Sequence, residues 1–103
     1  MEKIWYKNII DKSDGILGIC LVFNGYKAFK HNHKEDETYF FLYGTGKMFC
    51  DNKTFIVNSP DIIKIKGNDL HCMTPISEYV ILMYYFKQGP FDKIKYNYTL
   101  SKL

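Results

Sequence analysis

Residues 25–44 read GYKAFKHNHKEDETYFFLYG, and this stretch decides the fold. His31 and His33 are two positions apart, so on a β-strand both side chains point to the same face. Glu37 lies four positions beyond His33, which is again an even offset. The aromatic residues on both sides of the three polar residues favour strands. The stretch therefore predicts two imidazoles and a carboxylate on one face of a β-structure.

These residue types suit a divalent metal ion. Neutral imidazole nitrogens and one carboxylate are ligands for Zn, Mn, Fe, Ni or Cu, and His71, after a turn in a later predicted strand, is a further candidate. The same residues also fit a solvated hairpin end, because the charged segment 34–36 is their neighbour. A helix would bring His33 and Glu37 together at i, i+4, but the flanking aromatics and the Asn24-Gly25 turn argue against it.

The rest of the chain consists of short apolar or alternating runs separated by turn residues, which is typical of all-β proteins. Asn24-Gly25 is the strongest hairpin signal, and the tail 91–103 predicts an edge strand or a contact in a dimer. We expect strands at 16–23, 26–33, 37–43, 47–50, 54–57, 62–66, 71–74 and 78–86, the last of them fully buried. So many short strands in 103 residues predict a sandwich or closed barrel forming one domain, residues 1–103.

Composition supports a folded β-domain and argues against nucleic acid as a partner. The chain is 47% hydrophobic and 17% aromatic, with nine Tyr and eight Phe, which provides a core and favours strands. The net charge of +3 comes from scattered lysines without a single arginine. Nucleic-acid-binding proteins cluster their basic residues and use arginine for bidentate contacts.

The three cysteines, Cys20, Cys50 and Cys72, form no CxxC motif and are odd in number. A disulfide framework is therefore not expected, and small core residues are the better interpretation. The N-terminus has no apolar signal core, and no run of 18 apolar residues exists that would span a membrane. We expect a cytoplasmic protein without a membrane partner.

The spacing within residues 25–44 resembles the first cupin motif: Gly, five residues, His-x-His, three or four residues, Glu, six residues, Gly. Here the spacings are five, one, three and six. The second cupin motif is Pro-x-Gly, two residues, His, three residues, Asn. The matching stretch is 65–67 followed by His71, with Ile65 in place of the Pro, a gap one residue longer, and Pro75 in place of the Asn.

The resemblance implies an all-β cupin jelly-roll β-barrel, also called a double-stranded β-helix. It further implies that His31, His33, Glu37 and His71 coordinate one divalent transition metal, whether Mn, Fe, Zn, Ni or Cu. Three His and one Glu leave about two open positions on an octahedral metal, where a small molecule with adjacent oxygens can chelate.

Two functions remain open. One is a metal-dependent isomerase, lyase or dioxygenase acting on a small oxygen-rich molecule such as a sugar or a hydroxy or keto acid. The other is a non-catalytic module that binds a sugar or another small molecule, which the lack of an acid–base group outside the metal ligands favours. Fold alone does not decide between them.

Strand parity also predicts which residues surround the metal site. The last long strand turns either Met83 with Tyr85 or Leu82 with Tyr84 to that face, and we take the first pair. The candidate substrate pocket then comprises Phe29, Tyr39, Phe41, Met73, Met83 and Tyr85. A tyrosine there can donate a proton or hold a substrate hydroxyl, although any one tyrosine is more often a core residue.

Apolar residues near both chain ends predict a homodimer formed by strand exchange or sheet extension. They are Trp5, Tyr6, Phe91, Tyr96 and Tyr98. Gly44 and Gly46 are expected to serve turns that need an unusual φ.

Overall fold

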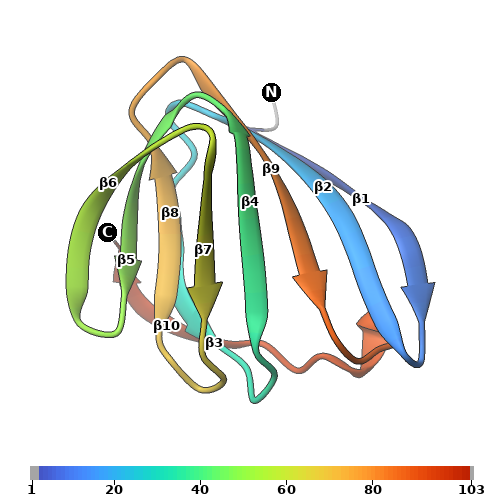
Figure 1. Cartoon of the computed structure of the whole chain (residues 1–103). Coiled ribbons are helices and arrows are strands. Elements are labelled where there is room, and N and C mark those ends of the chain that lie inside the picture. The colour runs from blue at the N-terminus through green and yellow to red at the C-terminus, as the bar shows by residue number, and fades with distance from the viewer. Residues whose placement is uncertain (1–2, 103) are drawn as a thin grey trace.

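A computed structural model describes residues 3–102 as two antiparallel β-sheets that face each other (Figure 1). One sheet has the strand order β1-β2-β9-β4-β7 and the other the order β10-β3-β8-β5-β6. The strands are β1 (Ile4–Lys12), β2 (Gly15–Phe23), β3 (Phe29–Asn32), β4 (Glu37–Tyr43), β5 (Thr45–Cys50), β6 (Lys53–Asn58), β7 (Asp61–Ile65), β8 (His71–Pro75), β9 (Tyr79–Phe86) and β10 (Asn97–Lys102). A single-turn 3-10 helix, η1 (Phe91–Lys93), precedes β10. No helix in this described part of the chain is long and apolar enough to cross a membrane.

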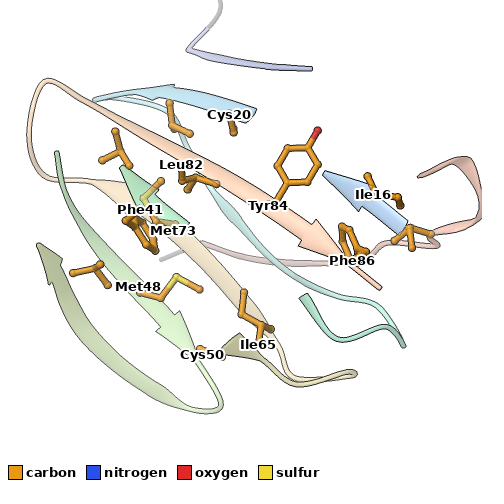
Figure 2. Close-up of a cluster of buried hydrophobic side chains, with 14 residues drawn as sticks. Ile16, Cys20, Phe41, Met48, Cys50, Ile65, Met73, Leu82, Tyr84 and Phe86 are labelled. Carbon is orange, nitrogen blue, oxygen red and sulfur yellow. The ribbon is translucent and has the colours of Figure 1, made fainter. Parts of the chain in front are cut away.

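The core lies between the two sheets (Figure 2). Alternate residues of β2 and β9 point inward, including Ile16, Leu82 and Phe86, and Met48 of β5 meets them from the other sheet. The alternation corrects the expectation that the last long strand is buried on both sides, because its remaining side chains, such as Met83, are only half-buried. One face of each sheet is therefore packed and the other meets solvent, as is usual for antiparallel sheets.

The N-terminal strand was not expected from the sequence, and its presence changes the connections. β1 forms a hairpin with β2 through the turn at 13–14, so the hairpin predicted at Asn24-Gly25 is wrong. That turn instead carries the chain from β2 in one sheet to β3 in the other. The Asn24 side-chain amide donates hydrogen bonds to the carbonyl oxygens of Ile76 and Ser77, which ties this crossover to the β8–β9 connection.

The C-terminal tail forms the predicted edge strand. β10 pairs with β3, and Tyr98 lies opposite His31. β1 and β10 are thus edge strands of the two sheets, and the segment between β9 and β10 crosses the lower end of the molecule in Figure 1.

Candidate metal centre

Two strands and one turn bring the three histidines together. His31 of β3 lies directly opposite His71 of β8, and His33 follows in the turn that leads to β4. One potential ligand atom from each of the three lies within 4.8 Å of the others. His33 and His71 are completely buried, with 1% and 0% of their surface exposed.

Backbone carbonyls fix the orientation of all three rings. The Nδ1 atoms of His31, His33 and His71 lie 3.2, 2.9 and 2.8 Å from the carbonyl oxygens of Phe29, Glu35 and Asp69. A carbonyl oxygen only accepts, so each Nδ1 carries a proton and donates it. In a neutral ring this leaves Nε2 as the atom with the lone pair, and hydrogen bonding to the other nitrogen is how proteins orient histidine ligands. Nε2 of His33 carries a proton where it donates to the Glu37 carboxylate, and a metal ion bound there would replace that proton.

Glu37, the first residue of β4, completes the cluster from the opposite sheet. Its Oε1 lies 3.1 Å from Nε2 of His33 and 3.4 Å from Nε2 of His71. Burial raises the pKa of the Glu37 carboxyl, but the contacts with the two histidines outweigh burial and hold its pKa below the usual value. The carboxylate is therefore ionised, as a metal ligand must be.

The imidazoles differ in their titration. Burial, with the nearby His71, lowers the pKa of His31 to about 4, so this ring is neutral at physiological pH. Burial is the largest single influence on the pKa of His33 and lowers it, but the hydrogen bond and charge of Glu37, together with the contacts to Glu35, outweigh burial, so the net shift is upward.

One ring nitrogen of the cluster has no hydrogen-bond partner within residues 3–102. Nε2 of His71 is buried and has no hydrogen-bond partner of good geometry, although Oε1 of Glu37 lies 3.4 Å away. A buried polar atom without a partner is rare and costs about 1–3 kcal/mol. A cation held between Nε2 of His71 and the neighbouring donors would remove that cost, so the residues present fit a metal ion.

Sequence reasoning missed Glu35. It belongs to the charged segment 34–36, which predicts a solvated turn, yet only 5% of its surface is exposed. Its carbonyl oxygen orients His33, and its carboxylate atom Oε1 is buried without a partner among the described residues. The available signal was parity, because Glu35 lies two residues from both His33 and Glu37, whereas its exposed neighbours Lys34 and Asp36 have the opposite parity.

A cavity of about 330 Å³ lies beside the cluster, with His31 and Glu37 in its wall. Of the residues expected in the pocket, Phe29, Tyr39 and Met73 line this cavity. Phe41 does not line it, because the ring is 1% exposed and packs in the core instead.

The expectation for β9 is corrected. Leu82 and Tyr84 line the cavity, whereas Met83 and Tyr85 lie on the other face of the strand. The reason is the register with β2, which sets Tyr84 opposite Gly18. A Cβ atom on Gly18 would stand only 2.0 Å from Cζ of Tyr84, so the glycine provides the space that the tyrosine ring occupies. Gly18 interrupts the apolar run of β2, and that interruption was the available signal.

Residues expected at a dimer contact also line the cavity: Tyr6, Phe91, Tyr96 and Tyr98. The ring of Tyr96 lies 5.5 Å from that of His31 and 5.2 Å from that of His33, measured between centroids. The C-terminal segment thus forms a wall of the site, which the sequence did not predict because it depends on how the tail crosses the molecule.

Comparison with solved structures identifies the architecture. The chain is similar to an RmlC-like cupin family protein with a double-stranded β-helix fold from Methanocaldococcus jannaschii (TM-score 0.76, 10% identity, 84% of this chain and 82% of that one). It is similar to KdgF from Halomonas sp., with a TM-score of 0.80 and 13% identity over 87% of this chain and 83% of that one. It is also similar to the DMSP lyase DddQ from Ruegeria pomeroyi, with a TM-score of 0.81 and 12% identity over 94% of this chain, although the match covers only 52% of that chain.

No family model and no curated protein matches the sequence. At these identities the structural likeness establishes the fold. The chain is an all-β cupin-fold domain, a double-stranded β-helix, as the motif in residues 25–44 implied.

Proposed function

We propose that this protein is a metal-binding cupin in which His31, His33, Glu37 and His71 coordinate one divalent transition metal: Mn, Fe, Zn, Ni or Cu. The observation that carries the proposal is the hydrogen bonding of the rings. All three Nδ1 atoms face backbone carbonyls, which leaves the Nε2 atoms as ligands, while Glu37 contributes an ionised carboxylate between two of them. The donor set of three imidazoles and one carboxylate suits these metals.

We further propose that the protein is a metal-dependent enzyme of isomerase, lyase or dioxygenase type acting on a small oxygen-rich molecule. A bound metal would supply Lewis-acid activation of a coordinated oxygen, or oxygen chemistry if it is iron. The cavity that reaches His31 and Glu37 supports this proposal, as does the likeness to DddQ, whose name describes a lyase. Tyr39 and Tyr96 line the same cavity.

A non-catalytic binding module is the second candidate. The observation in its favour is the composition of the cavity wall, where the only ionisable groups other than tyrosines and cysteines are His31 and Glu37. Both belong to the proposed metal ligands, so no separate general acid or base with a pKa near neutrality lines the cavity. Turnover of a substrate by the metal-loaded protein would decide between the two.

We propose a cytoplasmic homodimer. The three cysteines are free thiols, which agrees with a reducing compartment. The edge strand β1 exposes about half of the surface of Trp5, Ile9 and Ile10, and an apolar edge strand is a site where a second copy can extend the sheet.

The first experiment measures metal content by elemental mass spectrometry on untagged protein purified without chelators. A His31→Ala/His33→Ala variant removes two ligands, and Lys34→Ala, an exposed neighbour, is the matched control. We expect close to one equivalent of a transition metal in the parent protein and in Lys34→Ala, and its loss in the double variant. Circular dichroism establishes that the double variant is folded. Absence of metal from all three, even after reconstitution, would refute the metal site.

A further inference from the structure

The cavity beside the metal centre has an unusual wall. Six of the nine tyrosines of the chain line it, together with Phe29 and Phe91. The remaining lining residues are aliphatic side chains and two cysteines, besides His31 and Glu37. Rings of the wall pack on one another, since Phe91 lies 6.0 Å from Tyr6 and 6.1 Å from Tyr96 between centroids. A ligand that enters the cavity therefore meets mainly aromatic and apolar surface.

Among the side chains that the structure describes, no basic one lines this cavity, although the chain contains 14 lysines. A carboxylate or phosphate on the body of a ligand would have no counter-charge there apart from a metal ion. Placing an unpaired anion in such surroundings carries a large desolvation cost. An anionic group is acceptable only where it binds the metal directly.

Polar partners for a ligand are also few. Apart from the proposed metal ligands, the described side chains of the wall offer polar groups only as tyrosine hydroxyls and two cysteine thiols. The Tyr84 hydroxyl has no proton left to donate to a ligand, because it donates a hydrogen bond to Oδ1 of Asn8. A polyhydroxylated sugar would leave several hydroxyls without partners, and each buried, unpaired hydroxyl costs about 1–3 kcal/mol.

We infer that the ligand is a small molecule that binds the metal through adjacent oxygens and has an uncharged, apolar or aromatic body. The inference rests on the proposed metal site. It narrows the class of ligands expected at that site, because it excludes polyhydroxylated sugars and molecules with a second anionic group. Flat or apolar bodies gain from stacking on the tyrosine and phenylalanine rings. The cavity volume of about 330 Å³ limits the ligand to a molecule of one or two rings.

The test compares three catechols that share one chelating group and differ only in charge: 4-methylcatechol, 3,4-dihydroxybenzoate and 3,4-dihydroxybenzylamine. Metal-free protein is loaded with Zn²⁺, which is redox-inert and does not oxidise the probes. Zinc content is measured first, and binding is then measured by isothermal titration calorimetry. Each affinity is divided by that of the probe for free Zn²⁺, so that differences in chelating strength cancel.

Two variants place a positive charge inside or outside the cavity. Tyr98 lines the cavity at its exposed rim, 67% exposed and 5.4 Å from the ring of His31, so Tyr98→Lys adds an ammonium group near the ligand. Tyr43 is 54% exposed and does not line the cavity, so Tyr43→Lys adds the same charge elsewhere.

We expect 4-methylcatechol to bind at least about tenfold more tightly than either charged probe. Tyr98→Lys should reduce its advantage over dihydroxybenzoate at least severalfold, whereas Tyr43→Lys should leave it unchanged. Equal or tighter binding of a charged probe to the parent protein would overturn the inference, and so would the absence of binding by all three to zinc-loaded protein. Failure to take up zinc or any other metal would instead overturn the proposed metal site, and the ligand class with it.

Discussion

Metal binding should stabilise the fold strongly, because the ligands are brought together only by folding. His31, Glu37 and His71 come from three strands in two sheets, so the unfolded chain has no equivalent site. The free energy of metal binding then appears as free energy of unfolding. With free metal at a concentration 1,000 times its Kd, the gain is about 4 kcal/mol.

That gain is large for a domain of this size. For about 100 residues, each kcal/mol shifts the melting temperature by about 4–8 °C. Saturating metal should therefore raise the Tm of the metal-free protein by roughly 16–32 °C. Binding of metal by cysteines in the unfolded chain would reduce the shift, so Mn²⁺ and Ni²⁺, which depend less on thiolates, are compared with Zn²⁺.

The assay is differential scanning calorimetry after removal of metal with EDTA and dialysis, followed by addition of each metal at fixed protein concentration. His33→Ala should lose most of the shift, because it removes one proposed ligand and the hydrogen bond to Glu37. Lys34→Ala should keep the shift. A Tm that moves by less than about 2 °C with every metal, or an undiminished shift in His33→Ala, would contradict the reasoning.

Three further predictions concern the fold around the site. Phe86→Ala should lower the free energy of unfolding in urea by about 3–5 kcal/mol, because the ring is fully buried and packs on that of His33 at 5.2 Å. Gly44→Ala should cost at least about 1–2 kcal/mol in the same assay, because Gly44 has a φ of +92° and a Cβ would stand 2.4 Å from the Tyr79 carbonyl oxygen. The thiols should not react with Ellman's reagent at pH 8 until the protein is unfolded, because all three are buried and burial raises the pKa of Cys20 to about 12.

Matched variants separate these effects from general destabilisation. Leu42→Ala, with half of its surface exposed, should change the free energy of unfolding far less than Phe86→Ala. Gly15→Ala should be tolerated better than Gly44→Ala, because its Cβ would meet only the Phe86 carbonyl oxygen at 3.5 Å. Rapid labelling of the native thiols, or equal losses in the two glycine variants, would be evidence against the described packing.

The strands with strong local patterns were predictable from the sequence, and the connections between sheets were not. β4 and the β5–β6 hairpin follow alternation and turn signals, and Asp51 and Asn52 adopt the positive φ that a tight hairpin favours. β1 was missed because its residues are mostly exposed and show no alternation of burial. Asn24-Gly25 correctly predicted a turn, but the strands on its two sides do not pair with each other. A local signal does not say which sheet the next strand joins.

His31, His33 and Glu37 were predictable as candidate ligands because they share a parity that needs no tertiary information, and His71 was predicted from the resemblance to the second motif. The pocket, in contrast, required tertiary information. Parity alone allowed either face of β9 to point inward. The choice depends on the register that places Tyr84 over Gly18. Tyr6 and Tyr96 enter the cavity wall because β1 and the C-terminal segment meet there, and no short-range pattern encodes that meeting.

His71 lies in the histidine cluster although the second motif is degenerate. Hydrogen bonds of the loop before His71 explain this position. The loop is one residue longer than the motif, and Asn68 adopts a left-handed conformation with a φ of +71°. The backbone N–H of Asn68 donates to the carbonyl oxygen of His33 at 2.7 Å, and the N–H of Gly67 donates to the Asp36 carboxylate at 2.6 Å. These bonds fasten the loop before His71 to the turn that carries His33.

Strand pairing then fixes the position of His71 relative to His31, because the two residues lie directly opposite each other in the β3–β8 ladder. Neither constraint involves the side chains at which this chain departs from the motif, Ile65 and Pro75. Ile65 is instead a buried core residue opposite Glu37 at the start of β4. The position of the last histidine is thus determined by the sheet register and by two hydrogen bonds that backbone N–H groups of the loop donate, one to a carbonyl oxygen and one to a carboxylate. His71 therefore reaches the cluster although the sequence around it departs from the motif.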